Sequence, residues 1–139
     1  MPKEIMEIRR LIVRLSRKSR GDLKKRLKAS RFKILPLAYN ILSLLDGRQL
    51  TIQELAEEMA INPPALVGAV DLLQRQGYLS RKSDPRDRRR APLAISKAGA
   101  AILKQVPPIA AGDTLAVNLL KLAGAQRALL LKTLTGLAA

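Results

Sequence analysis

The densest group of ionisable side chains is the segment 81–90, RKSDPRDRRR, which holds six cations and two carboxylates in ten positions. Clustered Lys and Arg residues bind polyanions, because neutralising the phosphates of a nucleic acid releases condensed counterions. Cys and His are absent from the chain, which removes thiolate nucleophiles, Cys/His zinc sites and the imidazole base of the usual catalytic triads. The side-chain chemistry therefore favours anion binding, and we expect neither enzymatic activity nor a cofactor.

The net charge of +15 lies mainly in basic segments that flank an acidic one. Residues 1–33 carry 13 Lys and Arg residues against 3 acidic residues, whereas residues 34–80 carry 2 against 5. This asymmetry favours a nucleic-acid partner, with a solvated charged surface and an anionic membrane surface as the alternatives. No apolar run approaches the roughly 20 residues of a membrane span, and the N-terminus MPKEIMEIRR lacks a signal-peptide core. We therefore expect a cytoplasmic protein.

The spacing of apolar residues predicts a mainly α-helical fold with an aliphatic core. A stripe at Ile5, Ile8, Ile12 and Leu15 lies on one face of a helix whose other face is basic. Such a helix could bury its stripe against a partner helix, wrap DNA or lie on a membrane surface. We expect SRGD at 19–22 to interrupt or kink it.

Two helices joined by a short turn are expected in the middle of the chain, after a buried helix in PLAYNILSLL. Thr51 and Glu54 have the T-x-x-E spacing of a capping box, which marks the start of the helix in TIQELAEEM. Asn62 suits an N-cap and Pro63 a first-turn position, so the next helix spans residues 62–76 and ends at Gly77. A helix, a turn of about three residues and a second helix have helix-turn-helix spacing.

A β-hairpin is expected directly after this motif. The runs YLSRK and APLAI are strand-like, and the polar turn SDPRDRRR separates them. Pro92 cannot donate a ladder hydrogen bond, which favours an edge strand. A hairpin behind a helix-turn-helix is a wing, so the predicted fold class is mainly α with a small β-hairpin wing.

The C-terminal third is expected to be helical. Ser96 suits the N-cap of a helix that Pro107 and Pro108 interrupt. The last segment, residues 114–137, carries Leu on nearly every side. A terminal helix so apolar needs a partner, and the stripe in residues 5–15 is the candidate.

Four motifs in this order resemble the MarR-type winged helix-turn-helix transcriptional regulators, and the resemblance covers nearly all of the chain. The motifs are LTIQELA at 50–56, VDLLQRQGYL at 70–79, DPRDRR at 84–89 and ISKAG at 95–99. The resemblance implies a homodimer that binds double-stranded DNA and acts as a transcriptional regulator, specifically a repressor. It also implies three parts: an N-terminal basic dimerisation helix at 1–33, a winged helix-turn-helix region at 34–96 and C-terminal dimerisation helices at 97–139.

The resemblance further implies that helix 62–76 enters the major groove while Arg89 of the wing enters the minor groove, with Asp87 orienting it. An Arg at a hairpin tip also suits a narrow minor groove on physical grounds, because the negative potential is enhanced there. The residues expected to contact DNA are Asn62, Ala65, Val67, Gln74, Arg75, Arg81, Lys82, Arg86, Asp87, Arg88, Arg89 and Arg90.

The expected outer face of helix 62–76 lacks hydrogen-bonding side chains, because it presents Pro64, Ala65, Val67 and Gly68. Only apolar contact with thymine methyl groups is available on that patch. Three accounts stay open: readout of DNA shape through the wing and other basic segments, which we favour; contact with a protein partner; or readout by the polar residues near the helix ends. The alternative function is accordingly a winged-helix protein-interaction module with only generic nucleic-acid affinity.

An unidentified small-molecule effector is a further implication of the resemblance. Phe32 and Tyr39 are candidates to line its pocket, although aromatics in an aromatic-poor chain are more often core residues. A cysteine switch is excluded because the chain has no Cys.

Overall fold

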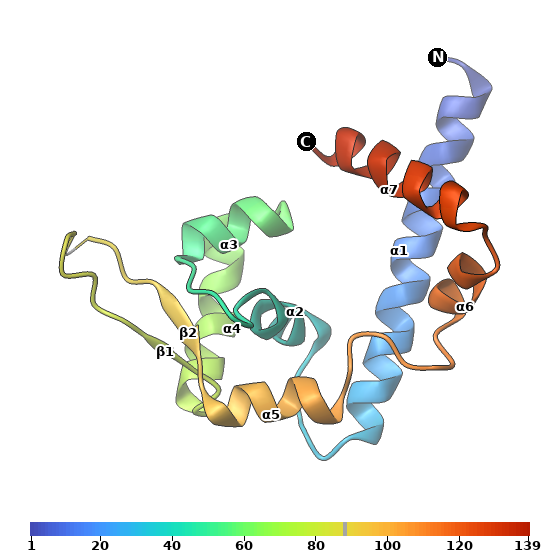
Figure 1. The fold of residues 1–139 in the computed structure, drawn as a ribbon. Helices are drawn as coiled ribbons and strands as arrows, with labels where there is room; N and C mark the ends of the chain where they lie inside the picture. Colours follow the sequence, from blue (N-terminus) through green and yellow to red (C-terminus); the bar gives the residue numbers. More distant parts are fainter. Residues whose placement is uncertain (88) are drawn as a thin grey trace. The chain divides into compact units, whose positions relative to one another are not determined.

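The computed structural model describes residues 1–87 and 89–139, so Arg88 lies outside the described residues (Figure 1). These residues form helices and one antiparallel hairpin, which confirms the predicted fold class. The elements are α1 (Lys3–Ala29), α2 (Pro36–Leu44), α3 (Ile52–Met59), α4 (Pro63–Arg75), β1 (Leu79–Arg81), β2 (Leu93–Ile95), α5 (Lys97–Gln105), α6 (Thr114–Leu120) and α7 (Gly124–Ala138). They fall into two compact units: Leu23–Pro108, and Met1–Asp22 together with Ile109–Ala139.

The unit Leu23–Pro108 has an aliphatic core where α2, α3, α4 and α5 meet. Its fully buried side chains include Ile41 of α2, Leu55 of α3, Leu66 of α4 and Ile102 of α5. Tyr39 is buried among them and donates a 2.5 Å hydrogen bond from its hydroxyl to the carbonyl of Val106. This bond satisfies the one polar atom of the ring and joins α2 to the end of α5.

The two ends of α3 confirm two predictions: the capping box at its start, and the short turn to α4 that gives helix-turn-helix spacing. The Thr51 hydroxyl accepts from the backbone N–H of Glu54, and the Glu54 carboxylate accepts from the N–H of Thr51, both at 3.1 Å. This reciprocal pair is the predicted capping box. Ala60 closes α3 in the left-handed conformation, with φ of 52°.

Asn62 occupies the predicted N-cap position of α4, but its side chain makes no capping hydrogen bond. The expected side-chain cap is therefore wrong. An N-cap oxygen accepts from the second or third residue of the helix. Pro64 has no N–H to give, and the N–H of Ala65 is already bonded to the carbonyl of Asn62 at 3.0 Å.

The hairpin confirms the predicted wing and pairs Leu79 with Ile95 and Arg81 with Leu93. Pro92 lies just before β2, where its carbonyl accepts from Lys82 at 2.7 Å, so the proline removes no ladder hydrogen bond. On its other side, β2 forms a single antiparallel bridge from Leu93 to Leu50. This bridge ties the wing to the loop that leads into α3.

The base of the hairpin is joined to α5 through Ser96 and Gly99. The Ser96 hydroxyl accepts from the N–H of Gly99 at 3.1 Å, as predicted for a cap, and donates to the carbonyl of Gly77 at 2.6 Å. A Cβ at position 99 would stand 2.2 Å from the carbonyl oxygen of Tyr78. Only glycine therefore fits where α5 crosses the start of the hairpin.

Helix α1 continues without a break through residues 19–22, so the expected interruption there is wrong. A glycine costs a helix only about 1 kcal/mol, whereas the next two turns bury Leu23 and Leu27 in the core. The packing of these two leucines accounts for the continuity of the helix.

The unit formed by Met1–Asp22 and Ile109–Ala139 contains two C-terminal helices where the sequence suggested a single apolar segment. Asp113 caps α6 by accepting from the N–H of Ala116 at 2.9 Å. In the single chain α7 stays largely uncovered, with Leu129 66% and Leu131 69% exposed. Among the described residues, no helix combines the length and hydropathy required to cross a membrane.

Candidate nucleic-acid interface

Helix α4 has one buried face and one exposed face, as its sequence predicts. Leu66, Val70 and Leu73 are fully buried, because their spacing of four and three residues aligns them toward the core. Val67 and Leu72 are 42% and 47% exposed. The exposed face is apolar at its centre and becomes polar only toward the C-terminal end of the helix.

The C-terminal end of α4 is joined to the wing by Arg81 of β1. Its guanidinium donates to the Asp71 carboxylate at 2.7 Å and to the side-chain oxygen of Gln74. The structure thus brings together two of the predicted site residues, Gln74 and Arg81. The amide nitrogen of Gln74 keeps its donors, whereas much of the hydrogen-bonding capacity of Arg81 is used inside the protein.

The wing loop is shaped by two aspartates that accept from backbone N–H groups two residues ahead. Asp84 accepts from Arg86, and Asp87 accepts from Arg89, each at 2.9 Å. These are Asx turns, which fix a tight path for the chain. The Asp87 carboxylate holds the Arg89 backbone, because the N–H two residues ahead is the donor it reaches. Its role in orienting the Arg89 side chain stays a prediction.

Four of the predicted site cations are exposed, and their side chains have no hydrogen bond or ion pair within residues 1–87 and 89–139: Arg75, Lys82, Arg86 and Arg89. Asn62, at the other end of α4, is exposed as well. Unpaired cations on the wing and at the end of the adjacent helix α4 suit a polyanion, because no internal ion pair has to be broken for them to bind it.

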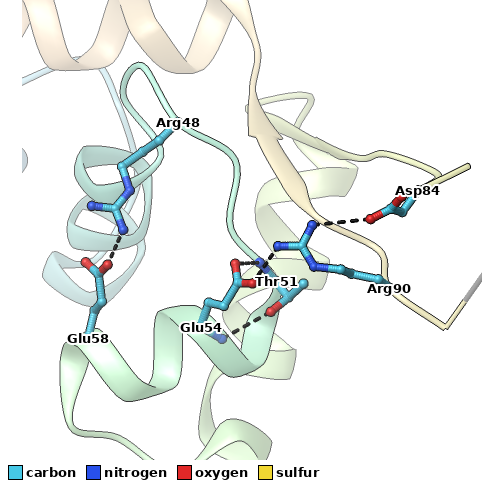
Figure 2. A network of polar contacts seen from close by, with 6 residues as sticks. All are labelled: Arg48, Thr51, Glu54, Glu58, Asp84 and Arg90. Carbon is cyan, nitrogen blue, oxygen red and sulfur yellow. Dashed lines mark hydrogen bonds and ion pairs between the residues drawn. The ribbon is translucent and has the colours of Figure 1, made fainter. Parts of the chain in front are cut away.

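Arg90 differs from these cations because it is held in a network that reaches α3 (Figure 2). Its guanidinium lies 2.5 Å from a Glu54 oxygen and 3.4 Å from an Asp84 oxygen. Figure 2 shows that Glu54 contributes to this network and to the capping box with Thr51 at the same time. Arg90 therefore connects the first turn of α3 with both arms of the wing.

The charges in this network stabilise each other. The Arg90 guanidinium, followed by the Thr51 N–H, holds the pKa of Glu54 below its ordinary value of 4.5. The Arg86 N–H, followed by the Arg90 guanidinium, holds the pKa of Asp84 below its ordinary value of 3.8. Glu54 and Asp84 were not among the residues predicted for the site. No sequence signal indicates the pairing, because Glu54 and Arg90 are 36 residues apart.

The two aromatic candidates for an effector pocket have different surroundings. Tyr39 is a core residue, and burial raises its pKa. Phe32 lines an open pocket of about 450 Å³ in the unit Leu23–Pro108, and the Arg31 guanidinium lies 5.1 Å from its ring centre. Lys24 and Lys28 add positive charge to this pocket. A pocket with this lining suits an organic anion better than a neutral ligand.

A helix-turn-helix followed by a hairpin over one aliphatic core defines a winged helix-turn-helix protein. The comparisons with known proteins agree with this class. The sequence model of the MarR family matches residues 32–90, which confirms the predicted resemblance over this part of the chain. No curated protein sequence matches the chain.

Solved structures of MarR-type regulators share the fold over almost the entire chain. BldR, a transcriptional regulator from Sulfolobus solfataricus, is 22% identical, with 99% of this chain and 97% of that chain covered and a TM-score of 0.79. A mutant MarR from E. coli complexed with operator DNA is 24% identical, with 96% and 95% covered and a TM-score of 0.77. Sco3205, a MarR family transcriptional regulator from Streptomyces coelicolor in complex with DNA, is 22% identical, with 99% and 88% covered and a TM-score of 0.77.

Proposed function

We propose that this protein is a transcriptional regulator that binds double-stranded DNA as a homodimer and acts as a repressor. The observation that carries the proposal is the wing, where Lys82, Arg86 and Arg89 are exposed and unpaired among the described residues. Two of the structures that share the fold are complexes with DNA. The net charge of +15 would speed the encounter with a polyanion and favour non-specific binding.

In the proposed complex, α4 lies in the major groove and Arg89 enters the minor groove. The middle of α4 offers Ala65 and Val67, which can only make apolar contacts, for example with thymine methyl groups. Hydrogen bonds to base edges come from Asn62, Gln74 and Arg75 at the two ends of the helix. We therefore propose that DNA shape and deformability contribute more to selectivity than direct readout of bases.

The proposed homodimer rests on apolar surface that the single chain leaves uncovered. Ile8 and Ile12 of α1 are 49% and 45% exposed, and α7 exposes Leu129 and Leu131 more strongly. Large apolar side chains left exposed along a helix in this way favour a protein interface. We propose that residues 1–33 and 97–139 supply dimerisation helices around the winged helix-turn-helix region 34–96.

The decisive experiment is selection of bound duplexes from a random pool at two salt concentrations, followed by titration of a selected and a scrambled duplex. We expect an A/T-rich preference with a steep loss of affinity as salt rises, because phosphate contacts dominate. A sharp palindrome would favour base readout by α4. Absence of measurable duplex binding at low salt would refute the proposed function.

The second candidate is a protein-interaction module, which the exposed Val67 and Leu72 favour. Val67→Glu alone does not separate the two functions, because a carboxylate on this face would abolish capture of a protein partner and would also repel DNA phosphates. Gln74→Ala is the companion variant, since it removes a polar group without placing charge on the apolar patch. Loss of duplex affinity in both variants supports DNA binding, whereas an effect of Val67→Glu on protein capture alone supports the interaction module.

A small-molecule effector is the remaining part of the proposal. DNA binding by one protein of this fold, BpsR from Bordetella bronchiseptica, is described as regulated by 6-hydroxynicotinic acid. In this chain we propose the pocket lined by Phe32, Lys24 and Lys28 as the effector site. Calorimetric titration with aromatic carboxylates tests it, with Lys28→Gln as the variant expected to weaken binding.

A further inference from the structure

We propose that Arg90 is a positioning residue of the wing and not a DNA contact. It fixes the wing to α3 and so presents Arg86 and Arg89 to DNA in one arrangement. The effect of Arg90 on DNA binding rests on the proposed function, because a fixed wing presents its cations to DNA only if the wing binds DNA. The tether itself is a property of the free protein.

The positions of the three linked residues support a tether. Glu54 lies on the first turn of α3, Asp84 on the outgoing arm of the wing and Arg90 on the returning arm, just before β2 (Figure 2). One guanidinium contacts both carboxylates, at 2.5 Å and 3.4 Å. Without these contacts, the described part of the hairpin would be anchored near its base, by the β1–β2 ladder, the Leu50 bridge and the contacts of Arg81 with α4.

The surroundings of Arg90 also limit its use as a phosphate contact. Two carboxylates already partly neutralise its charge, and leaving them for DNA would cost those contacts. The guanidinium groups of Arg86 and Arg89, by contrast, have no internal partner among the described residues. Among the described residues, the wing therefore combines cations with free side chains, Lys82, Arg86 and Arg89, with Arg90, whose side chain is used for structure.

Glu54 has two separable roles, which makes the proposal testable. One carboxylate oxygen closes the capping box with Thr51, and the other accepts from Arg90. Gln serves the capping box as well as Glu does. Glu54→Gln should therefore weaken the tether while keeping α3 capped.

The chain offers a matched control on the same helix. Glu58 of α3 forms an ion pair with Arg48 that is exposed to a similar degree but does not involve the wing (Figure 2). Glu58→Gln removes one carboxylate charge from α3, as Glu54→Gln does. Any effect of net charge on DNA binding should therefore be equal in the two variants.

The first measurement is amide hydrogen exchange of the wing in the DNA-free protein. Arg90→Gln and Glu54→Gln should accelerate exchange in the wing, and Glu58→Gln should not. Combining Arg90→Gln with Glu54→Gln should have less than the sum of the two effects, since both remove the same contact. Unchanged exchange in both single variants would overturn the tether, whether or not the protein binds DNA.

The second measurement is duplex affinity as a function of salt. Loss of exposed ion pairs of this kind should lower the affinity by about two- to fivefold in Arg90→Gln. The slope of log K against log salt should stay that of the wild type, whereas Arg86→Gln should reduce the slope by about 0.9. An equal reduction of the slope in Arg90→Gln would show that Arg90 contacts phosphate and would overturn the proposal. Failure of the wild type to bind duplex would refute the proposed function, and the exchange experiment would still decide the tether.

Discussion

At the scale of single residues, the arginines of the wing region divide by what their guanidinium groups contact. Arg81 is bonded to Asp71 and Gln74 of α4, and Arg90 to Glu54 and Asp84. Arg89 has no such partner among the described residues, and Asp87 fixes its backbone. Identical side chains in one short segment therefore have different tasks, set by which carboxylates the fold places beside them.

Replacing Arg89 should weaken DNA binding without affecting folding. Arg89→Gln removes an exposed charge that has no internal partner, so the thermal unfolding temperature should stay unchanged. Duplex affinity should fall about tenfold if the side chain enters a minor groove. Fluorescence anisotropy with a labelled duplex measures the loss. Lys104→Gln in α5 is the charge-matched control, and an equal loss in that variant would mean that only net charge matters.

The Arg90 network should make stability depend on pH in the acidic range. The lowered pKa of Glu54 means that the folded state favours the carboxylate, so this contribution is complete above the ordinary value of 4.5 and is lost as pH falls through the lowered value. Urea unfolding of the wild type and of Arg90→Gln should therefore differ at neutral pH and converge in acid. A difference that persists below the pKa of both carboxylates would mean that Arg90 stabilises the protein by other contacts.

At the scale of elements, close backbone approaches position the interface. Helix α5 passes so near the start of β1 that a Cβ at Gly99 would collide with the Tyr78 carbonyl. Ser96 adds hydrogen bonds at the same crossing. The base of the wing is thus fixed by a backbone contact, and its outer part is linked to α3 by an ion-pair network.

Two glycine substitutions should have opposite effects. Gly99→Ala should lower the free energy of unfolding by about 1 to 3 kcal/mol, because the backbone carbonyl in its way cannot rotate aside. Gly68→Ala should raise it by up to about 1 kcal/mol, because a Cβ there meets nothing and alanine favours the helix. Chemical denaturation at equilibrium measures both. Equal effects of the two substitutions would contradict the close approach.

At the scale of the whole molecule, the described chain leaves much apolar surface to be covered by another molecule. The unit Leu23–Pro108 has a buried core of its own, whereas α7 in the other unit has no buried residue. An exposed helix with leucines on most sides is unfavourable in water. The proposed homodimer would remove this surface from solvent.

Charges introduced on the leucine-rich side of α7 should therefore dissociate the proposed dimer. Leu130 and Leu134 are four residues apart and lie on one face, so changing both to Glu places two carboxylates in the interface. Ala128→Glu with Thr135→Glu adds the same charge on the opposite side of the helix and serves as the control. Sedimentation velocity should give a monomer for the first pair and a dimer for the second. A monomeric wild type would exclude the homodimer at the concentration used.

Local features in the sequence were sufficient to predict most of the elements of this protein. The Thr51–Glu54 capping box, the Ser96 cap, Gly77 and the two faces of α4 depend on residues only a few positions apart, so pattern and spacing determine them. Even here local competitors mattered, since Pro64 has no N–H and the N–H of Ala65 is bonded to the Asn62 carbonyl, which leaves the Asn62 side chain without a donor to cap.

The tertiary structure decided which charged side chains have no internal partner. It also decided that a helix continues where the local sequence favours an interruption. The pairing of Arg90 with Glu54 spans 36 residues, and no local spacing encodes it. Continuity of α1 through residues 19–22 depends on Leu23 and Leu27 packing in a core assembled from distant helices. Both the ion pairing of Arg90 and the continuity of α1 are stabilised by contacts between residues far apart in the sequence, and these contacts exist only once the chain is folded.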